Sequence, residues 1–276
     1  MRDFSNDHSA LAINGATVKS WSLQQLVDGC ARASIGGIAP WRDIVQAVGI
    51  SRAGQIIRDA GIAVTGLCRA GLFPAADEAG RRAAFDDNKR AVDEAAGIGA
   101  PCLVLIGGGL PKGSKDLSGV HAQVRDGLAA LLPYARQAGV ALALEPLHPM
   151  YAADRGCINT MAHANDLCEQ LGDGIGIALD AYHVWWDPDL PRQIARAGKR
   201  IISYHVCDWL VPTTDLLLDR GMMGDGVIDL RAMRQMVEAA GYTGAVDVEI
   251  FSANNWWKRN PDEVLKVCVE RFRACV

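Results

Sequence analysis

The sequence predicts an α/β protein in which eight parallel strands and their helices close into one (β/α)8 barrel. Short apolar, Gly-bounded runs alternate with longer amphipathic stretches to the end of the chain, and no composition break divides it. Most of the apolar runs lack polar alternation, as is typical of strands buried on both faces of a parallel sheet. We expect a single domain, 1–276, because the chain has 276 residues and one such barrel takes about 250.

Eight apolar runs are the predicted strands. An open, doubly wound sheet is the alternative, but its Gly-rich fingerprint after the first strand is missing. Gly107–Gly109, after the fourth run, is a weak candidate for a phosphate-binding loop, and we favour a tight turn there. The predicted strands are Leu11–Asn14, Gly37–Trp41, Ala63–Leu67, Cys102–Ile106, Ala141–Pro146, Ile175–Asp180, Ile201–Val206 and Ala245–Phe251.

The segments between these runs have the pattern of amphipathic helices. Several end in a repeated signature, RDAGIAV, RQAGVAL and EAAGYTGAV, in which glycine follows the last helical turn and the next strand begins at once. Glycine suits the left-handed residue that ends many helices. Predicted helices include Ser22–Ala33, Arg52–Ala60, Asp86–Ile98, Val120–Ala138, Thr160–Leu171 and Leu230–Ala240.

Composition excludes several classes of function. The net charge of −4 offers no footprint for nucleic acid and no attraction to an anionic membrane. The polar start, MRDFSNDHSA, is not a secretory signal, and no stretch approaches the roughly 20 apolar residues of a membrane span. We therefore expect a cytoplasmic protein. The eight cysteines form no CxxC pair, so we expect small core residues instead of disulfides.

The last four predicted strands each end in side chains that bind metals. In barrels of this kind, functional side chains come from the C-terminal ends of the strands. Each residue alone has a structural explanation as a helix cap, a surface charge or a hydrogen-bonded histidine. Four of them on four neighbouring strands predict one divalent metal site above the barrel axis. The candidates are Glu145 in ALALEPLHP, Asp180 and His183 in GIALDAYHVWW, His205 and Asp208 in IISYHVCDW, and Glu249 in AVDVEIFS.

Three carboxylates and one imidazole predict a mostly hard metal ion. Mn²⁺ is the first expectation, with Mg²⁺ or Co²⁺ as alternatives, because thiolate ligands are absent from the set. Such an ion acts as a Lewis acid on a bound carbonyl, so that a nearby base removes the proton of the adjacent carbon and leaves a metal-stabilised enolate. A carboxylate on each face gives epimerisation, and one carboxylate alone gives isomerisation. A leaving group β to the carbonyl makes the enzyme a lyase.

Five segments carry a family resemblance: LEP, LDxxH, YHVxD, DRGMMGDGVID and VEIF. With them the chain resembles the xylose-isomerase-like TIM barrels, which include sugar phosphate isomerases/epimerases, ketose 3-epimerases and inosose dehydratases. The resemblance runs nearly end to end and is most specific over residues 140–252. It implies one divalent metal with ligands Glu145, Asp180, His205 and Glu249. It also implies proton transfer by Glu145 and Glu249.

Four polar residues are candidates for roles around the predicted metal. The resemblance implies that His183 and Arg220 touch substrate oxygens. Arg220 lies in a glycine-rich loop, where pairing with Asp219 or Asp225 is the structural alternative. His148 stands where the family often has asparagine, so it is a catalytic candidate or a supporting partner, and both possibilities stay open. Asp208 is a candidate for substrate binding.

Tryptophans follow the ends of several predicted strands. Their faces stack on sugar rings, so they predict the wall of a carbohydrate pocket, with core packing as the alternative. We expect Trp185, Trp209 and Trp256 to contact substrate. Exposed pairs at 185–186 and 256–257 also suggest a homo-oligomer. The full set is Trp41, Trp185, Trp186, Trp209, Trp256 and Trp257.

The predicted function is a metal-dependent isomerase or epimerase acting on a sugar, keto-sugar or glycoside. The aromatic bulk and the segments DRGMMGDGVID and VEIFSANNWW resemble barrels that cleave 3-keto-glycosides. The second possibility is therefore a lyase that cleaves 3-keto-glycosides or dehydrates a keto-polyol by β-elimination through the same enolate. An apurinic-site endonuclease is a distant alternative, since its extra histidines are missing from CRAGLFP and LIGGG. A non-catalytic binding barrel would require a missing ligand.

Overall fold

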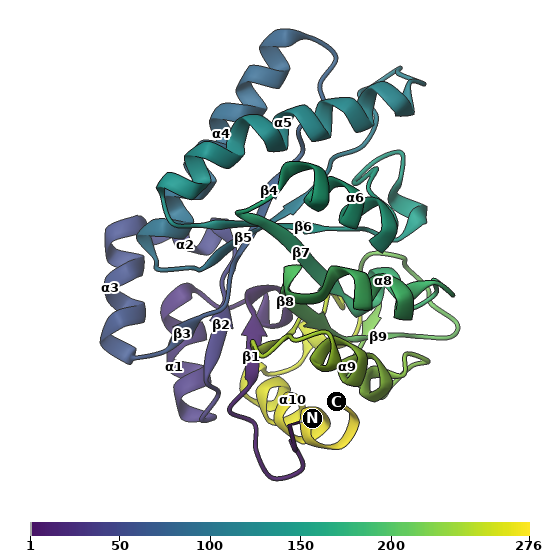
Figure 1. Cartoon of the computed structure of the whole chain (residues 1–276). Coiled ribbons are helices and arrows are strands. Elements are labelled where there is room, and N and C mark those ends of the chain that lie inside the picture. Colours follow the sequence, from purple (N-terminus) through teal and green to yellow (C-terminus); the bar gives the residue numbers. More distant parts are fainter. Residues whose placement is uncertain (1) are drawn as a thin grey trace.

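A computed structural model describes residues 2–276 and confirms the barrel of parallel strands with helices around it. In Figure 1 the two termini lie close together beside α10. The strands are β1 (Leu11–Asn14), β2 (Gly37–Ala39), β3 (Ala63–Val64), β4 (Leu67–Gly71), β5 (Cys102–Ile106), β6 (Ala141–Glu145), β7 (Ile175–Asp180), β8 (Ile201–Val206), β9 (Asp208–Trp209), β10 (Arg220–Gly221) and β11 (Val246–Val248). The helices are α1 (Leu23–Arg32), α2 (Arg42–Val48), α3 (Ile50–Ala60), α4 (Glu78–Gly97), α5 (Leu117–Gln137), α6 (Met161–Leu171), α7 (Ala181–Val184), α8 (Leu190–Ala197), α9 (Leu230–Ala239) and α10 (Pro261–Cys275).

The barrel strands pair in the order β3-β2-β1-β11-β8-β7-β6-β5-β4, and all of these pairings are parallel. β3 and β4 are successive pieces of one run: β3 pairs with β2, whereas β4 pairs with β5. Residues 63–71 therefore close the barrel. β9 and β10 form a separate antiparallel pair beyond the end of β8.

The predicted third strand, Ala63–Leu67, is wrong in its extent. The structure has two short strands, β3 and β4, and the second continues to Gly71. Gly71 has φ +103°, and a Cβ at this position would collide with the carbonyl of Ile106. Only glycine fits such a close approach with a positive φ. Arg69 interrupts the apolar run, which is why the sequence pattern ends too early.

Helix α4 begins at Glu78 and not at the predicted Asp86. The side chain of Asp77 caps it by accepting a hydrogen bond from the backbone N–H of Gly80 at 2.8 Å. All buried residues of α4 lie between Asn88 and Ala95. The first turns have no apolar face, so hydrophobic periodicity misses them.

Apolar layers lie on both sides of the strands. The larger layer packs strands against helices and includes Leu103 and Leu105 of β5 and Leu142 of β6. Small side chains fill the barrel interior, in a cluster of Cys68, Cys102, Val104, Ala143 and Ala178. All eight cysteines are free and all but Cys275 are buried, as expected from the sequence. None of the described helices is long and apolar enough to cross a membrane.

Candidate active site

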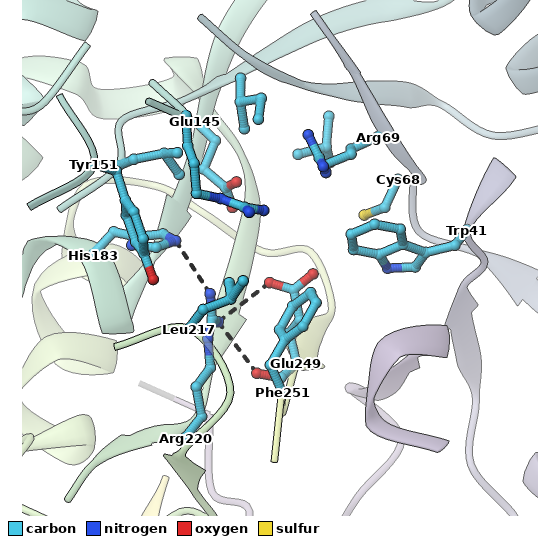
Figure 2. Close-up of a pocket in the computed structure, with 14 residues that line it drawn as sticks. Trp41, Cys68, Arg69, Glu145, Tyr151, His183, Leu217, Arg220, Glu249 and Phe251 are labelled. Atoms are coloured by element: carbon cyan, nitrogen blue, oxygen red, sulfur yellow. Dashed lines mark hydrogen bonds and ion pairs between the residues drawn. The ribbon is translucent and has the colours of Figure 1, made fainter. Parts of the chain in front are cut away.

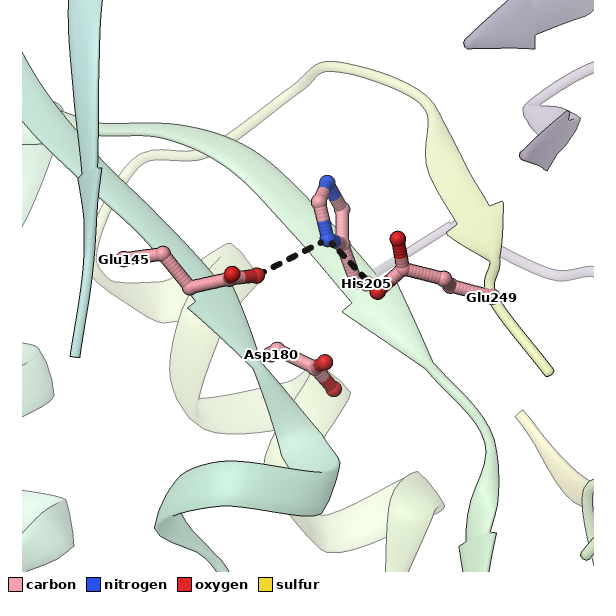
Figure 3. Close-up of side chains that lie close together, drawn as sticks. All are labelled: Glu145, Asp180, His205 and Glu249. Atoms are coloured by element: carbon pink, nitrogen blue, oxygen red, sulfur yellow. Dashed lines mark ion pairs between the residues drawn. The ribbon is translucent and has the colours of Figure 1, made fainter. Parts of the chain in front are cut away.

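Four ionisable side chains converge at the C-terminal ends of neighbouring strands. Glu145 ends β6, Asp180 ends β7, His205 lies near the end of β8, and Glu249 directly follows β11. Figure 3 shows them pointing toward one another, with Glu145 and Glu249 approaching from opposite sides. Each offers one ligand atom within 4.8 Å of the others, and all four are buried. The structure therefore brings together the whole predicted ligand set.

Two atoms of this cluster test whether it fits a cation. Glu145 Oε1 and His205 Nδ1 are buried and have no hydrogen-bond partner. The other ring nitrogen of His205, Nε2, lies 2.9 Å from the hydroxyl of Ser203. His205 Nδ1 therefore faces Glu145 Oε1 at 3.4 Å and Glu249 Oε2 at 3.7 Å. A nitrogen lone pair beside carboxylate oxygens is repulsive unless a proton or a metal ion lies between them, so these residues fit a metal.

The protonation of the cluster reflects the same crowding. Burial lowers the pKa of His205, but Glu145 and Glu249 outweigh this effect and hold the pKa well above its usual value. Burial and the charge of Glu249 raise the pKa of Glu145. Burial also acts to raise the pKa of Glu249, but His205 and Arg220 overcome it and the pKa is lowered. The two glutamates thus lie in different electrostatic environments.

Arg220 joins this cluster from the loop strand β10. Its guanidinium donates to Asp180 Oδ2 at 2.8 Å and lies 3.4 Å from Glu249 Oε2. The alternative pairing with Asp219 or Asp225 is wrong: Asp219 accepts from Thr214, and Asp225 pairs with Arg271. The glycine-rich loop therefore delivers Arg220 into the barrel mouth.

His183 is held as a neutral imidazole. Arg220 Nη2 donates to its Nε2 at 3.2 Å, which leaves the ring proton on Nδ1. The backbone nitrogen of His148 lies 3.3 Å from this Nδ1. Burial lowers the pKa of His183 to about 3, although Asp180 Oδ2 lies 3.7 Å away and opposes the shift. A neutral ring beside the four clustered side chains can exchange a hydrogen bond with an oxygen of a bound molecule.

A pocket opens directly above these groups. The empty space within it, including its open mouth, is about 430 Å³. Figure 2 shows Glu145, His183, Arg220 and Glu249 around it, with Trp41 on another side. The lining residues are Trp41, Cys68, Arg69, Val104, Ile106, Glu145, Leu147, Tyr151, Arg155, His183, Leu217, Arg220, Glu249 and Phe251.

A loop lies over one side of the pocket and is held by two tyrosines. The hydroxyls of Tyr151 and Tyr182 both donate to the backbone carbonyl of Leu216. The neighbouring Leu217 lines the pocket. This arrangement fixes the segment between β9 and β10 next to the site.

Several predicted substrate residues lie outside this lining. Asp208 is fully buried, and its carboxylate accepts backbone hydrogen bonds from Trp209, Gly224 and Ile228. It thereby holds the loop that carries Arg220. The ring of His148 stacks on Trp209 with centroids 5.1 Å apart. These positions indicate supporting contacts, and direct roles for both residues stay predictions.

The tryptophan pairs are not exposed, contrary to expectation. Trp256 is buried, and Trp185, Trp186 and Trp257 are half-buried. Trp186 and Trp257 donate their indole N–H groups to backbone carbonyls. Neither pair lines the pocket, and neither Trp185, Trp209 nor Trp256 reaches it. The exposure of these tryptophans therefore supports neither a homo-oligomer nor stacking on a sugar, and both stay predictions.

Sequence reasoning missed several residues that line the pocket. Arg69 was detectable in the sequence as a charge within an apolar strand run. Burying a charge without a partner costs free energy, so a charge at such a position indicates a functional role. Tyr151 ends the short 3-10 helix Pro149–Tyr151, whereas Arg155 and Leu217 lie in loops, and none of the three belongs to a recognisable motif. Trp41 was among the tryptophans considered for the pocket, and it does line it.

A family model described as xylose isomerase-like TIM barrel matches residues 27–274. The chain is 60% identical to protein SMc04130 of Sinorhizobium meliloti 1021, whose solved structure superposes with a TM-score of 0.96 over 98% of this chain and 99% of that one. An inosose isomerase of Halalkalibacterium halodurans is 28% identical over 201 residues, 71% of this chain and 68% of that protein. The IOLI protein, solved with a binding zinc atom, is 21% identical and has a TM-score of 0.83 over 96% of this chain and 97% of that one, which shows a shared fold.

Proposed function

Because the chain belongs to the xylose isomerase-like TIM barrel family, we propose that it is a divalent-metal-dependent isomerase or epimerase of a sugar or polyol ketone. One observation carries the proposal. Four ligand-type side chains lie within 4.8 Å of one another beneath an open pocket, and two of their buried atoms have no partner within the described chain. A relative named inosose isomerase supports the same class of reaction.

Glu145, Asp180, His205 and Glu249 would hold the ion. Their oxygen-rich set favours Mn²⁺, with Mg²⁺ or Co²⁺ as alternatives, and the zinc of the IOLI structure makes Zn²⁺ a further ion to test. Such an ion would polarise a substrate carbonyl and stabilise the negative charge that develops on its oxygen.

The protein side chains would do the proton chemistry. Glu145 and Glu249 both line the pocket and approach it from opposite sides (Figures 2 and 3). One carboxylate would remove the proton beside the carbonyl, and the other would return a proton to the opposite face, which inverts that carbon. His183 and Arg220 would hold substrate oxygens.

The first experiment measures bound metal and proton exchange together. Elemental analysis of the wild type should find about one divalent metal per chain, and Glu249→Gln should bind it more weakly. In D₂O the loaded enzyme should exchange the proton beside the carbonyl of one substrate among free ketoses, an inosose and 3-keto-glucosides.

The absence of both metal and exchange would refute the proposal and leave a binding barrel. Exchange accompanied by loss of a substituent from the neighbouring carbon would identify an elimination, the lyase alternative, which begins with the same proton removal. Recovery of an inverted sugar would identify an epimerase, and recovery of an aldose an isomerase.

A further inference from the structure

Two arginines of the pocket have no carboxylate partner. Arg69 lies in β4, and Arg155 lies in the loop between β6 and α6. Both line the pocket that holds Glu145 and Glu249. Across residues 2–276, neither side chain donates a hydrogen bond or forms an ion pair, although Arg69 lies over the ring of Trp41 and Arg155 over the ring of Tyr151, each 5.7 Å from the ring centroid. In contrast, Arg220 in the same pocket binds two carboxylates.

The charges around the pocket leave these two arginines uncompensated. Glu145, Asp180 and Glu249 carry three negative charges, which a divalent ion and Arg220 would balance. Burial lowers the pKa of Arg69, and the charge of Arg155 lowers it further. Glu145 and Glu249 oppose this shift from a distance, but neither forms an ion pair with Arg69. Arginine nonetheless stays protonated in proteins. Two half-buried like charges without a counter-charge need a ligand that supplies one.

The position of Arg69 separates it from the metal-binding end of the pocket. Figure 2 draws Arg69 on the side of Trp41 and Cys68, apart from His183 and Arg220. Trp41 and Arg69 also line an adjoining surface groove, where Lys19 pairs with Asp43 and Arg42 pairs with Asp87. A ligand with its carbonyl near Glu145 and Glu249 would thus extend toward Arg69, whose charge is not paired there.

We infer that Arg69 and Arg155 bind an anionic group of the substrate, either a carboxylate or a phosphate ester. The planar guanidinium matches both groups, since each accepts two parallel hydrogen bonds from it. The inference rests on the proposed function for the identity of the reactive end, and it narrows the substrate from a neutral ketose to a keto acid or keto-sugar phosphate.

The test compares three ligands that differ at one carbon: D-fructose, D-fructose 6-phosphate and D-fructuronate. Calorimetry with the Mn²⁺-loaded protein should show that one anionic ligand binds at least about tenfold more tightly than D-fructose. The tighter of the two anions identifies the group. Arg69→Gln and Arg155→Gln should each remove this advantage.

Arg192→Gln is the matched control, because Arg192 is exposed and pairs only with Asp189 on the helix surface. This variant should keep the preference for the anion. Arg69→Lys covers the case in which Arg69→Gln does not fold. Lysine keeps the positive charge but lacks the two parallel N–H donors of the guanidinium, so this variant should retain part of the tighter binding of the anionic ligand. Equal binding of all three ligands, or no binding of any, would overturn the inference, as would a preference that survives both glutamine variants.

Failure of this inference can be told apart from failure of the proposed function. Mn²⁺ binding with exchange of D-fructose but no anion preference would refute the inference alone. If none of Mn²⁺, Mg²⁺, Co²⁺ and Zn²⁺ binds, the proposed function fails, while the effect of Arg155→Gln on binding of the anionic ligands remains measurable in the metal-free protein.

Discussion

The two halves of the barrel share one architecture but end their strands differently. β6, β7, β8 and β11 end at or beside four buried ionisable side chains, whereas β1, β2, β4 and β5 end in Asn14, Ala39, Gly71 and Ile106. Pairing is parallel in both halves, and the apolar outer layer continues around them. The barrel fold therefore does not depend on which side chains stand at the ends of its strands, and these positions are free to differ in chemistry. Both halves line the pocket, but only the second half supplies the four side chains that would hold the metal.

Removal of a ligand should have the largest effect. Glu145→Gln keeps the side-chain shape but loses the charge, so we expect Mn²⁺ affinity to fall by at least about 100-fold and proton exchange by at least about 100-fold. The matched control is Glu94→Gln in the first half, a buried glutamate that binds Arg42 and Gln46. It should lose stability but keep Mn²⁺ binding, as measured by calorimetry. Equal loss of metal in both variants would contradict the division between the halves.

Loss of the buried cation should come next. Arg220→Met leaves Asp180 and Glu249 without their guanidinium, so the metal-free protein should lose about 3–5 kcal/mol of unfolding free energy. Urea denaturation in EDTA measures this loss, and added Mn²⁺ should recover part of it.

Arg42→Met is the equivalent change in the first half, where Arg42 binds the half-exposed Asp87 and the buried Glu94. It should cost less and show no added benefit from Mn²⁺ over the wild type. A similar rescue of both variants would indicate that Arg220 has no special relation to the ligands.

A smaller loss of stability is expected for Asn88, whose side chain binds the backbone at the end of β4 in the first half. Asn88 is buried, accepts from the Gly71 N–H at 2.6 Å and donates to the Gly71 carbonyl at 2.7 Å. Asn88→Leu leaves these groups unpaired and should cost about 2–3 kcal/mol. Thermal unfolding measures the loss, while Mn²⁺ affinity should not change. A large drop in metal affinity would show that the end of β4 also positions the ligands.

The smallest effect concerns a histidine pair where the two halves meet. His163 on α6 lies edge-on to His121 on α5, with ring centroids 4.7 Å apart. Burial lowers the pKa of His163, and the charge of His121 lowers it further. The unfolded chain therefore binds the proton more readily, and stability falls as the pH drops through the unfolded pKa of about 6.5.

Replacement of this group should flatten the pH profile. His163→Gln should lose less stability between pH 7 and pH 5 than the wild type, as measured by urea denaturation at each pH. Metal-loaded and metal-free protein should show the same difference. An unchanged profile would assign the acid sensitivity to other groups.

Much of the fold and of the metal site was predictable from the sequence. Continuous apolar runs identify strands buried on both faces, and the neighbouring ends of parallel strands must meet above the axis, so Glu145, Asp180, His205 and Glu249 could be grouped before any coordinates. The third strand and the start of α4 were wrong in extent. Arg69 interrupts the apolar run of the third strand, so the pattern ended too early there. The first turns of α4 contain no buried apolar side chain, so the pattern began too late.

The sequence by itself therefore determined the barrel and the grouping of the four candidate ligands, because both depend on periodicity and on residues at strand ends. Only the tertiary structure decided which loop side chains reach the pocket. It turned Arg220 toward Asp180, assigned Asp208 to the backbone of its own loop, and placed Arg69 and Arg155 together without a carboxylate. Loop side chains have no fixed period, and their direction depends on contacts with segments far away in the sequence.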